Sequence, residues 1–177
     1  MDASSAYQDS LPIHPDTLLE KIVSLGISTN NYSHRPLRTV ADSKAFRDEL
    51  LTTEEGGAHI KNLYLRDKKK RNFLAVIQED KDVDLKALAD GLGAHRLSFG
   101  SEDRLLENLG VRPGAVTPLA MMHGASHHVT IGIDKDIITS KQLYMHPLVN
   151  DRTIAMTGAD LLVFLQAFSI TPIMLDI

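Results

Sequence analysis

Two strand-like runs on either side of a charged turn constrain the fold more than any other part of the sequence. The first run carries Ile60, Leu63 and Leu65. The second run, residues 73–77, is apolar at every position. Such runs around a polar turn predict a β-hairpin. Because a continuously apolar strand needs cover on both faces, we expect the second run in the centre of a sheet.

Helix-like and strand-like periods alternate along the rest of the sequence. Apolar residues spaced three and four apart predict helices at about 16–25, 40–51, 85–92, 102–109 and after Thr157. Their expected N-terminal caps are Thr17 with Glu20, Asp84 and Ser101. Strands are expected near 96–98, 127–134 and 173–175. Several strands follow short turns, so we predict an α/β fold with a mixed, partly antiparallel sheet surrounded by helices.

The length of 177 residues predicts one compact domain, because a domain usually holds about 100 to 200 residues. Residues 1–15 are polar and lack hydrophobic periodicity, so they are expected to form either a flexible lead or a strap on the domain surface. The domain itself is expected to span 16–177. A second catalytic domain does not fit this length.

The composition excludes several classes of chemistry. The sequence has no cysteine, which rules out disulfides, cysteine-ligated zinc, iron–sulfur clusters and a thiol nucleophile. A formal charge of -4 argues against wholly electrostatic nucleic-acid binding. The N-terminus lacks the basic and apolar regions of a signal peptide, and no apolar run reaches the roughly 18 residues that span a bilayer. We therefore expect a cytoplasmic protein without a membrane partner.

Basic residues are concentrated in one short segment. Residues 59–71 contain six Lys and Arg against one acid, Asp67. A hairpin tip of this kind is either a solvated turn or a contact for a phosphate backbone. Lys61 differs from the others because it lies inside the apolar-patterned run and precedes the amide Asn62. A partly desolvated lysine beside an asparagine can hold a phosphate or a developing oxyanion.

The segment 114–118 begins with Gly114 and ends with Pro118. Glycine lets a ligand approach the backbone, and backbone amides can face a carbonyl or an oxyanion. An ordinary turn at the entry to the next element explains the same residues. The sequence alone leaves both explanations open.

Two other patterns have ordinary structural explanations. The glycines of the segment 91–93 close a helix, whereas the glycines of a dinucleotide fingerprint open one after a strand. Ser98 and Ser101 do not lie in the G-x-S-x-G elbow of a serine hydrolase, and Ser101 is explained as an N-cap.

Four histidines, at positions 123, 127, 128 and 146, raise the question of a metal site. Adjacent His127 and His128 on a strand would point to opposite faces, so at most one of them could join a given site. The sequence also lacks HxH and HExxH spacings. We therefore expect no metal ligands here, and most of these histidines to be surface or core residues.

Four motifs in a fixed order resemble a known family. They are K-N-L-Y-L-R-D at 61–67, L-S-F-G-S at 97–101, G-x-x-x-P at 114–118 and Y-M-H-P-L-V-N at 144–150. Together they are similar to the YbaK/prolyl-tRNA-synthetase-associated family of aminoacyl-tRNA deacylases. The resemblance extends over about residues 16–177. It is closer to the freestanding ProXp-ala type, which hydrolyses Ala-tRNA(Pro), than to the Cys-tRNA(Pro) deacylase branch.

This resemblance implies roles for particular residues. Lys61 and Asn62 would be the site lysine and its neighbour, the amide of Gly114 would contact the aminoacyl carbonyl, and His146 would lie close to the aminoacyl group. Tyr64 stands where many relatives have Phe, which is expected to affect packing more than mechanism. The remaining implied substrate-binding residues are Ser98, Phe99, Gly100, Ala115, Val116, Thr117 and Pro118.

The implied partner is the acceptor end of tRNA(Pro), with prolyl-tRNA synthetase as a further candidate and without DNA, metal or cofactor. An aminoacyl ester is already activated, so a positioned water and a stabilised oxyanion can hydrolyse it without a covalent intermediate. By resemblance, the vicinal ribose hydroxyl serves as an internal acid or base. The alternatives are a deacylase for Cys- or Ser-tRNA, a non-catalytic module that binds a tRNA end or a nucleotide, and, less favoured, a metal-dependent hydrolase. In each editing hypothesis, Lys61 and Gly114 are expected to converge around a very small cavity.

Overall fold

The computed structural model describes residues 2–37 and 50–177, so nearly all of the helix expected at about 40–51 lies outside the described residues. Within these ranges eight strands form one sheet in the order β1-β7-β6-β2-β3-β5-β8, and the short strand β4 pairs with β2. The strands are β1 (Asn30–Ser33), β2 (Gly57–Arg66), β3 (Asn72–Gln78), β4 (Ser98–Phe99), β5 (Thr130–Asp134), β6 (Gln142–Met145), β7 (Arg152–Met156) and β8 (Ile173–Leu175).

The sheet is mixed, as predicted. Antiparallel pairs join β1 to β7, β6 to β7, β2 to β3 and β2 to β4. Parallel pairs join β2 to β6, β3 to β5 and β5 to β8. The predicted hairpin is confirmed as β2 and β3, which pair from Ile60↔Gln78 to Arg66↔Asn72.

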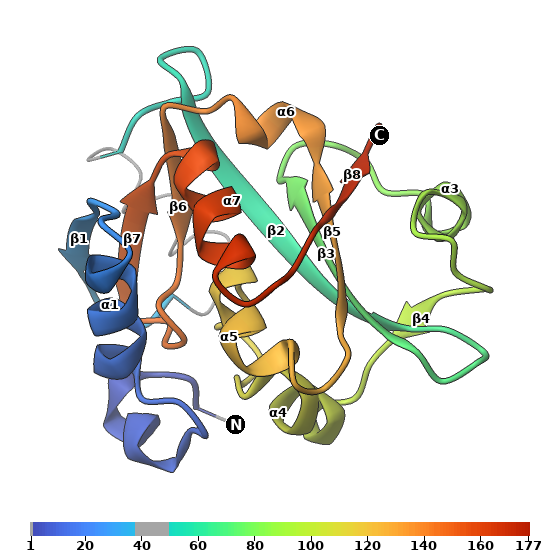
Figure 1. The fold of residues 1–177 in the computed structure, drawn as a ribbon, viewed down its shortest axis with the longest axis horizontal. Coiled ribbons are helices and arrows are strands. Elements are labelled where there is room, and N and C mark those ends of the chain that lie inside the picture. The colour runs from blue at the N-terminus through green and yellow to red at the C-terminus, as the bar shows by residue number, and fades with distance from the viewer. Residues whose placement is uncertain (1, 38–49) are drawn as a thin grey trace.

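Helices cover both faces of this sheet (Figure 1). The α-helices are α1 (Pro15–Ser24), α3 (Leu85–Gly91), α4 (Glu102–Leu109), α5 (Met121–Gly124), α6 (Lys135–Ile138) and α7 (Gly158–Gln166), and the 3-10 helices are η1 (Ser5–Ser10) and η3 (Pro118–Ala120). Leu74 and Val76 of β3 join a core cluster with Phe164 of α7. Their neighbours on the other face of β3, such as Phe73, join a second cluster with Leu88 of α3. The continuously apolar run is therefore a central strand covered on both faces, as predicted.

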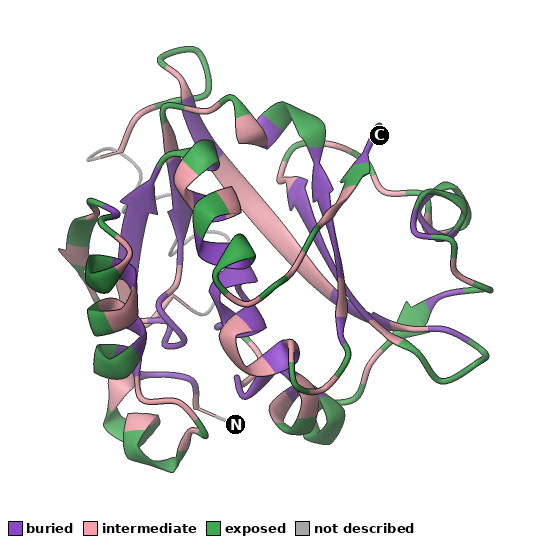
Figure 2. Cartoon of the chain, viewed as in Figure 1, coloured by how far each residue is buried: buried purple, intermediate pink, exposed green. Residues whose placement is uncertain are grey.

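Strand β2 connects the two halves of the sheet. Its first three residues pair in parallel with β6, and this pairing ends at His59↔Tyr144. From Ile60 onward β2 pairs with β3 instead. Residues 59–63 are only partly buried although they lie in a central strand, and Figure 2 shows β2 less buried than β3 and β5. The sheet therefore opens between β2 and β6.

The N-terminal residues form a surface strap, which was one of the two expectations for this segment. The main-chain oxygen of Ala3 accepts a hydrogen bond from the amide of Asn150. The Arg112 guanidinium donates to the main-chain oxygen of Asp2 at 3.0 Å, and the backbone of Ser5 donates to Asp151 at 3.0 Å.

Some local predictions need correction. Helix α1 is capped by His14, whose Nδ1 accepts from the amide of Asp16, with Pro15 at the first turn, and not by Thr17 with Glu20. Proline fits there because the first helical amides have no partner within the helix. The β4 strand occupies 98–99 rather than 96–98. The strands β1, β6 and β7 and the short helices α5 and α6 were not predicted.

The strand predicted at 127–134 begins only at Thr130. His127 and His128 precede it in a turn, and His128 has a positive φ of 55°. The expectation that these two histidines point to opposite faces of a strand is therefore wrong. Helix caps at Asp84, Ser101 and Thr157 are present. No helix within 2–37 and 50–177 is long and apolar enough to cross a membrane.

Candidate functional site

A small pocket lies where β2 and β6 separate. Its volume is about 100 Å³, and its walls include Asn62 of β2, Glu79 after β3, and His146 after β6. The rings of His59 and Tyr144, which also line it, stack with their centroids 5.1 Å apart. Pockets for drug-sized ligands usually measure about 300–1,000 Å³. This pocket fits a small side chain instead.

His146 lines this pocket, and one of its two ring nitrogens can accept a proton. Its Nδ1 lies 2.8 Å from the main-chain oxygen of Arg152. A carbonyl oxygen can only accept, so Nδ1 carries the proton, and Nε2 of the neutral ring keeps its lone pair. Burial lowers the pKa of His146 below its ordinary value of 6.5, outweighing the hydrogen bond to Arg152, which raises it. The ring is therefore neutral near pH 7.

Lys61 lies beside the pocket without lining it. Strand alternation places Lys61 on the same face of β2 as His59. Its amine donates to the main-chain oxygen of Glu79 at 3.0 Å and also to the main-chain oxygen of Lys81. Both acceptors are neutral, and no carboxylate among the described residues pairs with this amine. Within the described part of the chain, the Lys61 ammonium therefore lies next to a pocket wall and is bound by two main-chain oxygens rather than by a carboxylate.

Asn62 connects β2 to the loop 114–118. Its Nδ2 donates to the main-chain oxygen of Val116 at 2.9 Å. Its Oδ1 is buried and has no hydrogen-bond partner among the residues that the structure describes. Leaving a buried acceptor unsatisfied costs about 1–3 kcal/mol. Asn62 also lines the pocket, so it joins the pocket wall to the loop 114–118.

The loop approaches the pocket from a second direction through Gly114. This residue is exposed and has a positive φ of 94°, which favours glycine. A Cβ on Gly114 would lie 3.5 Å from Nδ2 of Asn150. That nitrogen donates to the main-chain oxygen of Leu37, which lines the pocket. The rest of the loop is mainly structural, because Ala115, Thr117 and Pro118 are buried.

Lys61 and Gly114 do not contact each other in the structure. The Lys61 amine is bound by residues 79 and 81, whereas Asn62 and Asn150 make the contacts with the loop. The predicted convergence of Lys61 and Gly114 around one cavity is therefore not seen, because neither residue is among those that line the pocket between β2 and β6. Asn150 had no separate role in the sequence analysis, although it ends the motif at 144–150.

The segment 98–100 lies farther along β2, and none of its residues is among those that line this pocket. Ser98 pairs opposite Arg66, and the amide of Gly100 donates to the main-chain oxygen of Tyr64 at 3.0 Å. A Cβ on Gly100 would lie 2.2 Å from the Tyr64 ring, so only glycine fits there. Phe99 is 65% exposed. The Tyr64 hydroxyl donates to Asn72 at 3.0 Å, a local structural contact.

Metal ligands do not cluster in the described part of the chain. No group of three or more His, Asp or Glu within 2–37 and 50–177 is arranged to hold a metal ion. His123 and His127 stack with their ring centroids 4.1 Å apart, and His123 Nε2 lies 3.0 Å from the main-chain oxygen of Glu107.

Comparison with known proteins extends this description. Residues 34–164 match the family model of the aminoacyl-tRNA editing domain. The prolyl-tRNA synthetase associated domain-containing protein 1 of Danio rerio is 36% identical over 161 residues, covering 90% of this chain and 85% of the relative. The prolyl-tRNA editing protein ProX of Acetoanaerobium sticklandii is 32% identical over 145 residues, covering 81% and 85%.

A solved structure shares the fold. It is described as a candidate trans-editing enzyme for prolyl-tRNA synthetase and matches with a TM-score of 0.67 at 14% identity, covering 92% of this chain and 96% of that one.

Proposed function

From the membership of this chain in the aminoacyl-tRNA editing domain family, we propose that it hydrolyses mischarged tRNA(Pro), with Ala-tRNA(Pro) as its substrate. The observation that carries this proposal is the pocket of about 100 Å³ between β2 and β6, with its neutral histidine and adjacent ammonium. The proposed partner is the acceptor end of tRNA(Pro). Association with the synthetase and a cytoplasmic location stay predictions.

The small volume of the pocket supports an aminoacyl group with a small side chain, and we propose that this group is alanine. A synthetase site large enough for proline cannot strongly reject alanine, because each methylene changes binding by only about 1–3 kcal/mol. A second, smaller pocket can accept the methyl group of alanine and exclude the proline ring.

We propose the following chemistry. His146 Nε2 accepts a proton from a water molecule as the water oxygen attacks the ester carbonyl carbon. The Lys61 ammonium, which contacts Glu79 at the pocket wall, stabilises the negative charge on the carbonyl oxygen. The bond between the carbonyl carbon and the ribose oxygen then breaks, and a proton passes to that oxygen. The products are free alanine and tRNA with an intact 3′ end.

An assay with labelled Ala-tRNA(Pro) tests this function. The expected result is release of alanine under multiple turnover, together with a weak shift of the tRNA in a native gel. A shift without release of alanine above the buffer rate would instead indicate a non-catalytic module that binds a tRNA end. Full activity after chelation would argue against a metal-dependent hydrolase.

The hairpin tip between β2 and β3 is the proposed contact for the RNA backbone. Lys68, Lys69 and Lys70 are exposed there. Arg71 is committed to the fully buried carboxylate of Asp67, at 2.7 Å. Burial alone would raise the pKa of Asp67, but hydrogen bonds from Arg71 outweigh it and lower the pKa. The three lysines thus remain available for phosphates.

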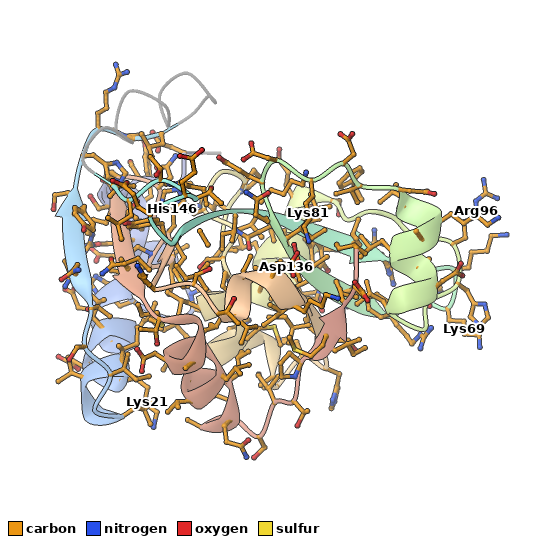
Figure 3. All side chains as sticks on the ribbon, turned by 90° about the horizontal axis from the view of Figure 1, so that it is seen from above. Lys21, Lys69, Lys81, Arg96, Asp136 and His146 are labelled. Atoms are coloured by element: carbon orange, nitrogen blue, oxygen red, sulfur yellow. The ribbon has the colours of Figure 1, made fainter. Side chains whose placement is uncertain are left out.

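Replacing Lys68, Lys69 and Lys70 with Ala is expected to weaken binding of uncharged tRNA(Pro) and to reduce its salt dependence. Each lost phosphate contact reduces the slope of log K against log salt by about 0.7–0.9. Titrations at several salt concentrations measure this slope. Lys21→Ala is the matched control, because Lys21 lies far from Lys69 in Figure 3 and packs over Phe168. An unchanged slope in the triple variant would identify the tip as a solvated turn.

A further inference from the structure

We propose that Asp134 and Lys81 are positioning residues that hold the Lys61 ammonium beside the pocket. This inference rests on the proposed function for its effect on catalysis, although the positioning itself can be tested without a substrate. It assigns a role to an ionic cluster around the buried carboxylate of Asp134, which the proposed chemistry leaves unused. The cluster consists of Lys81, Asp134 and Asp136.

The amine of Lys61 depends on a turn for both of its acceptors. The main-chain oxygens of Glu79 and Lys81 follow the end of β3 at Gln78. The β2–β3 pairing ends at Ile60↔Gln78, and beyond it one backbone hydrogen bond, from the Glu79 amide to the main-chain oxygen of His59 at 3.0 Å, ties the turn to β2, whereas Lys81 makes none to β2. The position of the ammonium is therefore only as well defined as the position of this turn.

Asp134 fixes the turn at both ends. The carboxylate is fully buried at the end of β5. One oxygen accepts from the backbone amide of Gln78 at 3.2 Å, and the other accepts from the Lys81 amine at 2.9 Å. A single buried side chain thus holds the first residue of the turn through its main chain and the last through its side chain.

The Lys81 amine is fully occupied within this cluster. Besides Asp134, it donates to Asp136 at 2.7 Å and to the main-chain oxygen of Ile177 at 2.7 Å. An ammonium has three hydrogens, and these three acceptors use all of them. Burial lowers the pKa of Lys81, but hydrogen bonds to Asp136 and Asp134 outweigh it and raise the pKa. Figure 3 shows Lys81 and Asp136 close together near the middle of the molecule.

The contacts of the two lysines therefore connect Asp134 to the pocket wall. Asp134 holds the Lys81 side chain, the Lys81 backbone holds the Lys61 amine, and Lys61 lies beside Glu79 at the pocket wall. A displacement of about 1 Å of a reacting group can lower a rate by about 10²-fold. Loosening the turn should thus reduce the chemical step more than the binding of tRNA.

The ammonium signal of Lys61 in nuclear magnetic resonance tests the positioning directly. In the free protein, ¹⁵N-lysine labelling should give an ammonium resonance that is protected from exchange and disappears in Lys61→Arg. In Asp134→Asn we expect this resonance to shift or broaden towards the signals of exposed lysines. Asp136→Asn is the matched control, since its side chain is 58% exposed and its carboxylate contacts Lys81 but not Gln78. It should leave the resonance in place.

The same variants separate positioning from binding in the deacylation assay. Asp134→Asn is expected to lower kcat at least about 10-fold with KM changed less than about twofold, and Asp136→Asn to change both by less than twofold. If Asp134→Asn does not fold, the double variant Asp134→Asn with Lys81→Gln removes both buried charges, which proteins tolerate better than removing one. The double variant should give the same resonance shift and kcat loss.

An unchanged Lys61 resonance in a folded Asp134 variant would overturn the proposal. If the Asp134 variants change the Lys61 resonance as expected but the wild-type protein releases no alanine, the positioning is supported and the proposed function is refuted. The two failures are therefore distinguishable.

Discussion

Lys61→Met is expected to lower kcat/KM for Ala-tRNA(Pro) by about 10²–10³-fold, because it removes the ammonium that stabilises the developing oxyanion. Methionine has a similar length and no charge, so it keeps the packing along β2. Thermal unfolding should change little, since the two main-chain oxygens that bind the amine belong to a partly exposed turn and can bind water. Single-turnover deacylation and a thermal melt measure the two effects.

Lys69→Met is the matched control for this variant, because Lys69 is exposed at the hairpin tip. It should leave the single-turnover rate at saturating enzyme unchanged. Lys61→Arg keeps the positive charge and is expected to retain part of the activity. Full activity of Lys61→Met in a folded protein would remove Lys61 from the mechanism.

His146→Asn is expected to lower kcat by about 10²–10⁴-fold, the usual contribution of a general base. The side-chain amide of asparagine can replace Nδ1 as the donor to Arg152, which keeps the hydrogen bond but removes Nε2. His146→Gln is the complementary variant, because its amide reaches the position of Nε2 and lacks the bond to Arg152. Wild-type activity in His146→Asn would show that another group accepts the proton.

The pH dependence follows from the same residue. Burial lowers the pKa of His146 below 6.5, so the base is active at pH 7 and the rate of the wild type should fall only as the pH drops below about 6.5. The free energy of unfolding changes with pH in the same direction as the rate. The unfolded chain binds the proton more readily than the folded one, so the free energy of unfolding also decreases below that pH. In His146→Asn, the decrease in rate and the decrease in the free energy of unfolding at acidic pH should both be smaller.

Local signals predicted much of the fold. The hairpin and its central strand followed from the continuous apolar run 73–77, whose burial on both faces is the direct result of its composition. The caps at Asp84 and Ser101 followed from side chains that accept from amides two or three residues away. Such features are determined by residues close together in the chain, so they can be predicted from the sequence.

Other features depend on contacts that a single sequence does not reveal. The turn at His127 and His128 requires a positive φ at a residue that rarely adopts one. The pocket exists because the parallel pairing of β2 with β6 stops at His59↔Tyr144, which joins segments far apart in the chain. The oxygens that bind Lys61 belong to residues 79 and 81 and carry no side-chain signal. Sequence analysis could therefore predict a role for the lysine but not the groups that surround it.

The most direct test is the initial rate of aminoacyl release from tRNA(Pro) charged in parallel with alanine, serine, cysteine or proline, at equal concentrations and below KM. The proposed editing of Ala-tRNA(Pro) at the pocket between β2 and β6 predicts that alanine is released fastest and proline at least about 10²-fold more slowly. Release of proline as fast as alanine, or no release of any of the four above the buffer rate, would contradict the account.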